Sequence, residues 1–142
     1  MANAWDITDA TLSTQLEKWR AFIIEETDYV MHLYQNNYTP VPGSTIANFT
    51  EADFENYEAQ PIIAADWGNV TILNHVASIQ NDTPCEFVAG AGPFDPQTVF
   101  GYYVTDADGV YLWSERFQVS RVVNPEDTLQ VTAVMRHATL PA

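Results

Sequence analysis

Four consecutive residues, Asp106-Ala107-Asp108-Gly109, resemble a metal site, because alternating carboxylates supply the oxygen ligands that calcium prefers. A helix-loop-helix calcium site continues to a bidentate Glu at the twelfth position of its loop. The twelfth residue counted from Asp106 is Phe117, whose side chain offers no oxygen. We therefore predict the turn of a β-hairpin here, and no metal site.

Histidine can bind zinc or act as a general base, and the chain contains His32, His75 and His137. These residues are far apart in the sequence, and none has a carboxylate or a cysteine at a ligand spacing. His32 lies in an alternating segment, as an ordinary strand side chain does. The histidines therefore predict neither a zinc site nor base catalysis.

Paired carboxylates can hydrolyse glycosidic bonds, and acidic residues cluster within residues 25–28 and 53–58. We interpret these clusters as solvated charge, because nearly any acidic protein contains them. Cys85 is predicted to be a small buried side chain rather than a nucleophile. The sequence contains no glycine-rich phosphate loop, serine nucleophile elbow or paired-cysteine motif. It therefore predicts a non-enzymatic protein with no catalytic residue and no cofactor.

The charge distribution restricts the partners. The chain has 19 acidic and 5 basic residues, a formal net charge of −14, and no Lys or Arg from Ala21 to Glu115. Nucleic-acid binding needs cationic side chains that neutralise phosphates, so we predict no nucleic-acid partner. The acidity serves either solubility or the choice of a cationic partner. No apolar run is long enough to span a membrane, and no signal-peptide pattern is present, so we expect synthesis in a cytoplasm and no membrane partner.

Hydrophobic periodicity predicts a helix followed by strands. Apolar residues at 12, 16, 19 and 23 share one face of a helix, which predicts an N-terminal arm and α-helix over 1–27. The period changes to two over 29–34, as in a strand. Thr50 and Asp53 have the spacing of a capping box, which predicts one short helical turn over 51–55.

The rest of the chain predicts short strands separated by turns that carry Gly, Pro, Asn or Asp. The predicted strands are 58–63, 70–79, 85–89, 99–105, 110–115, 117–123 and 128–135. This spacing is typical of β-sandwiches and barrels, and a chain of 142 residues fits one domain. We predict a mainly β single domain, 1–142, in which an antiparallel β-sandwich of jelly-roll or Ig-like type (28–142) follows the N-terminal α-helix.

Two parts of the chain resemble a group of small virion structural proteins of tailed bacteriophages. The first part is Leu-Tyr-Gln-Asn-Asn-Tyr-Thr-Pro (33–40) followed by Asn-Phe-Thr-Glu-Ala-Asp-Phe-Glu-Asn-Tyr (48–57). The second comprises 100–106, 112–117 and 124–132, beginning Phe-Gly-Tyr-Tyr-Val-Thr-Asp. Asn56 departs from the group, whose members usually have Gly before this Tyr, and the helical pattern at the start departs from the strand that they have there. The resemblance implies a component of a phage particle.

From this resemblance we expect a capsid decoration or cement protein that binds the outer coat lattice and stabilises the head, and therefore lies on the capsid surface of the virion. The implied partners are the major capsid protein and further copies of the chain itself, as a homotrimer by analogy with other cement proteins. An alternative is a tail-associated receptor- or carbohydrate-binding module. A third hypothesis, a small hydrolase, needs a pocket with convergent carboxylates.

Aromatic and cationic residues are the candidate contacts with the coat or with a neighbouring subunit. Trp113 alternates with Leu112 in a predicted strand, so one of the two points away from the core. Exposed aromatic residues serve a subunit interface or, alternatively, a sugar-stacking platform. The candidate contacts are Trp5, Lys18, Trp19, Arg20, Tyr34, Tyr38 and Trp113.

Overall fold

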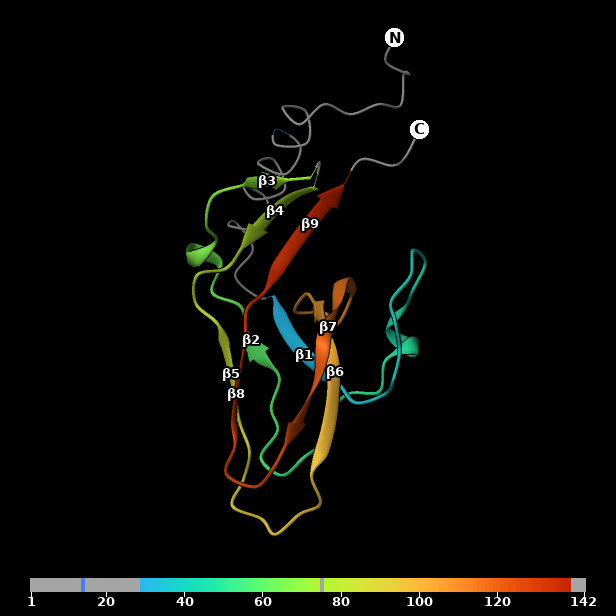
Figure 1. Ribbon diagram of the computed structural model, residues 1–142, viewed down its shortest axis with the longest axis vertical. Coiled ribbons are helices and arrows are strands. Elements are labelled where there is room, and N and C mark those ends of the chain that lie inside the picture. Colours follow the sequence, from blue (N-terminus) through green and yellow to red (C-terminus); the bar gives the residue numbers. More distant parts are fainter. Residues whose placement is uncertain (1–13, 15–28, 75, 139–142) are drawn as a thin grey trace. The chain divides into compact units, whose positions relative to one another are not determined.

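The computed structural model describes residues 14, 29–74 and 76–138 (Figure 1). The predicted arm and helix over 1–27 lie outside the described residues except for Thr14. The candidate contacts Trp5, Lys18, Trp19 and Arg20 lie outside them as well.

The described part of the chain is mainly β, as predicted, and its paired strands are all antiparallel. The strands are β1 (Val30–Tyr34), β2 (Gln60–Pro61), β3 (Thr71–Leu73), β4 (Val76–Gln80), β5 (Cys85–Val88), β6 (Gln97–Thr105), β7 (Tyr111–Val123), β8 (Thr128–Val131) and β9 (Val134–Ala138). Two single-turn 3-10 helices, η1 (Ile46–Asn48) and η2 (Ala64–Asp66), lie between strands.

The described residues divide into two compact units. The small unit contains residues 63–83 and 132–138, and its sheet has the order β3-β4-β9. The large unit contains residues 29–62 and 84–131, with one sheet of order β2-β1-β6-β7 and a second of order β5-β8.

Alternation of buried and exposed residues explains the sheets of the large unit. In β1, Met31 and Leu33 are fully buried, and in β5 Cys85 and Phe87 are buried while the residues between and after them are exposed. A strand that buries one face specifies its register, because a shift by one residue would expose that face. Residues two apart along β1 and β5 therefore contribute to the core of the large unit.

Gly101 in β6 is required by close packing. A Cβ atom at this position would lie 2.3 Å from the Glu115 carbonyl oxygen and 2.6 Å from the Tyr34 hydroxyl. Both distances are far below van der Waals contact, so a side chain here would displace backbone. The Gly-Tyr-Tyr segment of the sequence thus allows the Tyr34 ring to pack across the sheet.

Four predicted strands are wrong in their boundaries. The predicted strand 70–79 is the β3-β4 hairpin, which reverses where Asn74 adopts a φ of 50°, a left-handed conformation that Asn tolerates. The predicted strand 128–135 is interrupted after Val131 and forms β8 and β9. The predicted strands 110–115 and 117–123 are one strand, β7, in which Arg116 pairs with Gly101 and Arg121 with Val99. The strand therefore does not break at Arg116, and residues 117–120 form a bulge.

The predicted helical turn over 51–55 is also wrong. Glu51 forms a β-bridge with Tyr34, and the Ala52 N–H donates to the Leu33 carbonyl at 2.9 Å. The helical turn occurs earlier, at η1, where the Asn48 side chain accepts a hydrogen bond from the Thr45 N–H at 2.8 Å. Pairing with β1 satisfies the backbone after residue 50, and this outweighs the local capping pattern.

Candidate functional site

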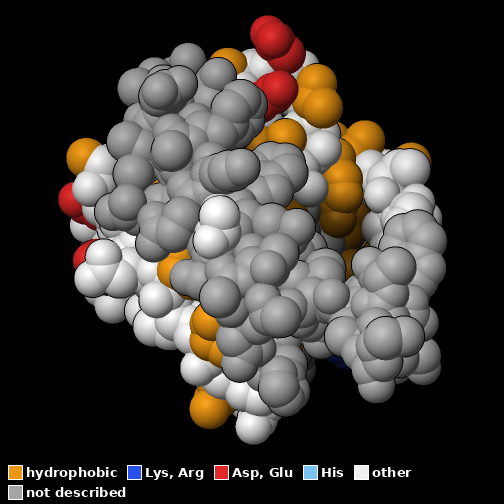
Figure 2. Space-filling model, turned by 90° about the horizontal axis from the view of Figure 1, so that it is seen from above, with side chains coloured by type: hydrophobic (Ala, Val, Ile, Leu, Met, Phe, Trp, Pro, Cys, Tyr) orange, Lys and Arg blue, Asp and Glu red, His pale blue; other side chains and the backbone are white. Residues whose placement is uncertain are grey.

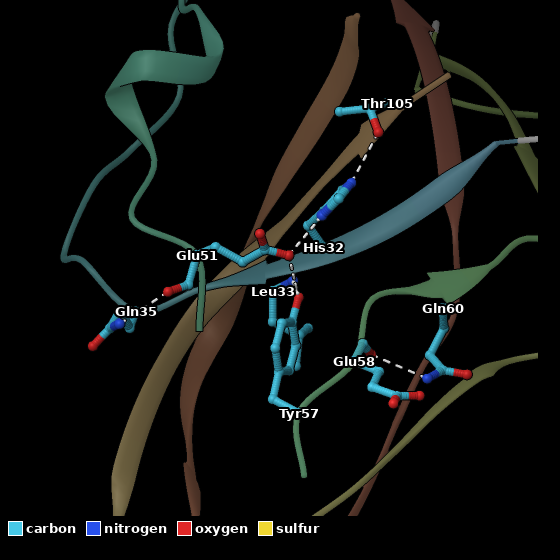
Figure 3. Close-up of polar contacts among 8 residues, drawn as sticks. All are labelled: His32, Leu33, Gln35, Glu51, Tyr57, Glu58, Gln60 and Thr105. Carbon is cyan, nitrogen blue, oxygen red and sulfur yellow. Dashed lines mark hydrogen bonds and ion pairs between the residues drawn. The ribbon is translucent and has the colours of Figure 1, made fainter. Parts of the chain in front are cut away.

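His32 on β1 is the centre of a polar cluster in the large unit (Figure 3). Its Nδ1 lies 2.6 Å from Glu51 Oε2, and its Nε2 lies 2.8 Å from Thr105 Oγ1 on β6. The imidazole stacks on the ring of Tyr103, with 4.7 Å between ring centroids and 5° between planes. The imidazole thus joins β1 to β6 and to the chain segment at residue 51.

Tyr57 completes this cluster, which we call the His32 cluster (His32, Glu51, Tyr57, Tyr103 and Thr105). The Tyr57 hydroxyl donates to Glu51 Oε2 at 2.8 Å and accepts the Leu33 N–H at 3.0 Å. Burial, and to a smaller degree the Glu51 carboxylate, raises the pKa of Tyr103 to about 12. Burial also raises the pKa of Tyr57 well above its ordinary value. Both phenols therefore keep their protons at neutral pH.

The order of hydroxyl, imidazole and carboxylate in this cluster is that of a serine-hydrolase triad. A triad needs a hydroxyl that a substrate can reach. Thr105 is only 2% exposed, so its hydroxyl meets no substrate. The geometry makes the His32 cluster a partly buried brace between three chain segments, in which the Thr105 hydroxyl is not accessible to a substrate.

Sequence reasoning did not predict the His32 cluster, because no carboxylate lies near His32 at a ligand spacing. Glu51 reaches His32 only through the Tyr34-Glu51 bridge, which joins residues 17 positions apart. Among the described residues, no three His, Cys, Asp or Glu side chains are placed to hold a metal ion.

The Asn-Asn turn after β1 is fixed by side-chain hydrogen bonds. Asn36 donates from Nδ2 to the Asn48 carbonyl at 2.9 Å and accepts the Thr50 N–H at 2.8 Å. Arg116 of β7 donates to the Tyr38 carbonyl at 2.9 Å and to Asn37 Oδ1 at 2.7 Å. The two parts of the chain that resemble virion proteins therefore meet directly.

Tyr34 packs in an aromatic cluster of the large unit and is completely buried, at 0% exposure. Phe49 lies at the centre of this cluster, stacked 4.9 Å from Tyr103 and 5.7 Å from Tyr111, with Tyr38 edge-on at 5.4 Å. Tyr34 was a candidate surface contact, but its buried side chain offers nothing to a partner. Burial also raises its pKa to about 12.

Above this cluster, an open groove of about 390 Å³ separates the loop Pro40-Ser44 from the start of β7. Its lining residues are Pro40, Val41, Pro42, Gly43, Ser44, Tyr111, Leu112, Trp113 and Ser114. None of them is charged. Val41 is 58% exposed and Leu112 is 38% exposed.

Of the candidate contacts, Trp113 lines this groove and Tyr38 supports it. Trp113 is half-buried and packs edge-on against Tyr29, with 6.1 Å between ring centroids. The Tyr38 hydroxyl lies 2.6 Å from Ser44 Oγ, and the Tyr111 hydroxyl 2.7 Å from Ser114 Oγ. The hydroxyl groups on the two walls are thus paired within each wall.

The turn at Asp106-Gly109 joins β6 to β7, which confirms the predicted hairpin. Asp106 Oδ1 accepts the N–H groups of Asp108 and Val110, both at 2.9 Å, and Gly109 has a φ of 82°. The Asp106 carboxylate therefore holds the turn together, while Asp108 is exposed.

Cys85 is buried, as predicted, and its thiol donates to the Pro61 carbonyl at 3.6 Å. Burial raises the pKa of this thiol to about 11. A thiol that keeps its proton at neutral pH is a poor nucleophile.

Acidic side chains lie scattered among hydrophobic and uncharged ones on the face drawn in Figure 2. The basic residues of the described chain are Arg116, Arg121 and Arg136, none of them in the groove lining. Within the described residues, no helix is long and apolar enough to cross a membrane.

Comparison with known proteins identifies no family. The sequence matches no protein-family model, and no curated protein gives a significant match.

Proposed function

We propose that the chain is a non-enzymatic structural protein of a tailed-phage particle, a decoration or cement protein that binds the outer coat lattice. The observation that carries this proposal is the groove with its exposed apolar rim. The lining carries no charged side chain, and Val41 and Leu112 expose apolar surface beside polar groups, a mixture that is typical of protein–protein interfaces. The two segments that resemble virion proteins contribute Pro40 and residues 112–114 to the lining, and the residues directly beside them contribute the rest.

The distinctive residues of these segments also support a structural role. Asn36 and Asn37 hold a turn, Phe49 fills the aromatic cluster, and Gly101 admits the Tyr34 ring. Asn56, which stands where the resembling proteins usually have Gly, adopts a φ of 68°. Gly and Asn are the residues that tolerate this conformation, so the departure preserves the turn.

The proposed architecture is a β-sandwich in the large unit, of jelly-roll or Ig-like type, preceded by an N-terminal α-helix. Its support is the packing of Tyr57 on Phe87 of β5, stacked 5.9 Å apart, and the hydrogen bond from Cys85 of β5 to Pro61 of β2. These contacts link the two sheets of the large unit through their buried faces.

The proposed mechanism needs no chemistry. A protein that binds only the assembled shell lowers the free energy of that shell by mass action. The partners would be the major capsid protein and further copies of the chain in a homotrimer, on the capsid surface of a virion assembled in the host cytoplasm. Nucleic acid and membranes are not partners in this proposal, since the chain is acidic.

The alternative, a tail-associated receptor- or carbohydrate-binding module, has one observation in its favour. Tyr111 and Trp113 line the same groove, and aromatic rings in a concave site can stack on sugars. The groove lining has no Asp, Asn, Glu or Gln to fix sugar hydroxyls. The cement hypothesis therefore accounts for the groove better.

Imaging of particles that contain or lack this protein tests the proposal. We expect density on the outside of the capsid that disappears when the protein is missing, and lower resistance of the depleted heads to heat. Density at the tail tip, or particles that are unchanged, would overturn the proposal.

A further inference from the structure

We infer that the free edge of β8 pairs with an extended segment of a partner protein, in which lysine or arginine alternates with apolar residues. The segment adds an antiparallel strand to the β5-β8 sheet of the large unit. This deepens the proposed function and rests on it for the source of the segment, a coat subunit. The form and the charge of the segment follow from the edge itself.

β8 directs the backbone groups of alternate residues away from β5. The Ala89 N–H donates to the Asp127 carbonyl at 2.8 Å, in register with the β5-β8 ladder. In an antiparallel ladder, every second pair of residues exchanges hydrogen bonds, so the next such pair after Asp127 contains Leu129. The residues between these pairs direct their N–H and C=O groups outward. Thr128 and Gln130 therefore present these groups on the outer edge of β8.

This outer edge has no partner among the described residues. β8 pairs with β5 alone, in a two-stranded sheet (Figure 1). Thr128 and Gln130 are both exposed, and no hydrogen bond from another described segment reaches their backbone groups. A sheet edge with unpaired N–H and C=O groups is a template for an additional strand.

Each of the other sheet edges of the large unit has a feature that disfavours strand addition. At β2, Pro61 has no N–H, and its carbonyl accepts the Cys85 thiol at 3.6 Å. At β5, the Val88 carbonyl accepts a hydrogen bond from Asn56 Nδ2 at 3.1 Å. At β7, the bulge over 117–120 interrupts the edge. β8 contains no proline, bulge or charged residue, so it is the edge that accepts a strand.

The two faces of β8 determine the alternation of the partner segment. Leu129 and Val131 are buried, whereas Thr128 and Gln130 are exposed. Directly opposed residues of neighbouring antiparallel strands lie on the same face of a sheet. Partner residues opposite Leu129 and Val131 therefore extend the buried face and favour apolar side chains. The partner residues between them lie on the exposed face.

The carboxylate of Glu86 on the exposed face favours a cationic partner. Glu86 of β5 is exposed and lies directly opposite Gln130, so the two side chains share this face. A partner residue opposite Gln130 lies two strand spacings from Glu86, about 10 Å, which a lysine and a glutamate side chain span together. β5 and β8 contain no cation of their own. A lysine or arginine is therefore favoured here, and β8 of a second copy does not supply one.

Four capped hexapeptides test this inference with the full chain. The parent peptide alternates lysine and valine, and a second peptide has glutamate in place of lysine. Two further peptides are the parent with methylated backbone nitrogens, either those of the lysines or those of the valines. In the added strand, the lysines oppose Thr128 and Gln130 and donate their N–H groups to β8, whereas the valine N–H groups point away from it.

Binding of the peptides is followed by the amide chemical shifts of the protein. We expect the parent peptide to shift the amides of Thr128 and Gln130. The glutamate peptide and the lysine-methylated peptide should bind at least about tenfold more weakly. The valine-methylated peptide has the same charge and the same number of methyl groups as the lysine-methylated one, and should bind like the parent.

Two variants of Gln130 provide a matched pair. Gln130→Pro removes an outward N–H that the fold does not use, and should weaken binding of the parent peptide at least about tenfold. Gln130→Ala removes the side chain but keeps this N–H, and should leave binding unchanged. Amide spectra check that both variants are folded. If Gln130→Pro does not fold, the two methylated peptides still decide between pairing at the edge and binding elsewhere.

A second matched pair tests the position of the charge. Glu86→Gln should weaken binding of the parent peptide by about two- to fivefold at low salt, the range of an exposed ion pair. Asp108→Asn removes an exposed carboxylate in the turn before β7 and should not weaken binding. Equal effects of the two variants would mean that net charge attracts the peptide, and would overturn the role of Glu86.

The inference is overturned if the two methylated peptides bind equally, or if the parent peptide binds without shifting the amides of β8. It is also overturned if these amides shift with protein concentration alone, because a second copy then occupies the edge. Failure of the proposed function is distinguishable. If the parent peptide binds at β8 but the protein is missing from the capsid, the cement proposal fails and the pairing at β8 stands. If folded Gln130→Pro decorates capsids as Gln130→Ala does, and no peptide binds at β8, the reverse holds.

Discussion

The His32 cluster and the groove lie in the same unit and use similar residue types in opposite ways. In the cluster, the His32 ring, the Glu51 carboxylate and the Tyr57 hydroxyl bind one another, and Thr105 is sealed from solvent. In the groove, hydroxyls are paired within each wall and apolar side chains face outward. Polar groups that satisfy one another stabilise a fold, whereas exposed apolar surface favours association. The His32 cluster therefore stabilises the large unit, whereas the groove is available for contact with a partner.

The largest expected effect comes from the aromatic cluster that lies beneath both regions. Phe49→Ala removes a buried ring that contacts Tyr38, Tyr103 and Tyr111, and should lower the free energy of unfolding by about 3–4 kcal/mol. Ile46→Ala, at a position that is exposed, should change it by less than about 0.5 kcal/mol. Urea denaturation measures both. Equal losses would show that Phe49 does not support the unit.

Alkaline pH should lower the stability of the fold, because it removes protons from buried thiol and phenol groups. The pKa of Cys85 is raised from 9.0 to about 11, so the unfolded chain loses this proton first, and stability present below pH 9 is lost as pH rises toward 11. This thiol should contribute a loss of about 2 kcal/mol between pH 8 and about pH 10.5, at about 1.4 kcal/mol per pKa unit. Tyr34 and Tyr103 extend the loss toward pH 12.

The control for this prediction is Cys85→Ala. The free energy of unfolding of this variant should fall less steeply over the same pH range, because the loss of about 2 kcal/mol assigned to the thiol is absent. Urea midpoints at each pH give the slopes of the two chains. Parallel slopes would contradict the assignment of the alkaline loss to Cys85.

Removal of the shared carboxylate should weaken the His32 cluster. Glu51→Ala deprives His32 and Tyr57 of their acceptor and should cost about 1–2 kcal/mol of stability, a modest value because the Glu51 side chain is 40% exposed. Asp95→Ala, an exposed carboxylate in the loop before β6, is the control for loss of charge alone. Urea denaturation measures both variants, and equal losses would show that the Glu51 carboxylate does not support the cluster.

The sequence predicted the positions of single strands better than it predicted where the strands end and which of them pair. Alternation located β1 and β5, because one face of each strand is buried and the pattern is local. It missed the hairpin at Asn74, because no Gly or Pro marks the reversal within 70–79 and Asn74 adopts the left-handed conformation instead. The β-class of the protein was therefore accessible from the sequence, but several strand ends were not.

The candidate site was less accessible for a physical reason. Trp113 was found because it alternates with Leu112 in the strand pattern, which directs one of the two side chains away from the core. The groove itself requires the loop 40–44 to fold beside residues 111–114, about seventy positions later in the chain. Similarly, the pairing of His32 with Glu51 depends on a bridge between distant backbone segments. Contacts of this kind are set by sheet register and long-range packing, which no short window of sequence encodes.

The smallest expected effect concerns an exposed charge in the turn between β6 and β7. Asp108→Ala should leave the free energy of unfolding within about 0.5 kcal/mol of the unmodified chain, because the side chain is exposed. Asp106→Ala should cost more, about 1 kcal/mol, since Asp106 Oδ1 accepts the N–H groups of Asp108 and Val110. Urea denaturation compares the two variants. The same loss in both would mean that the Asp106 carboxylate does not hold the turn.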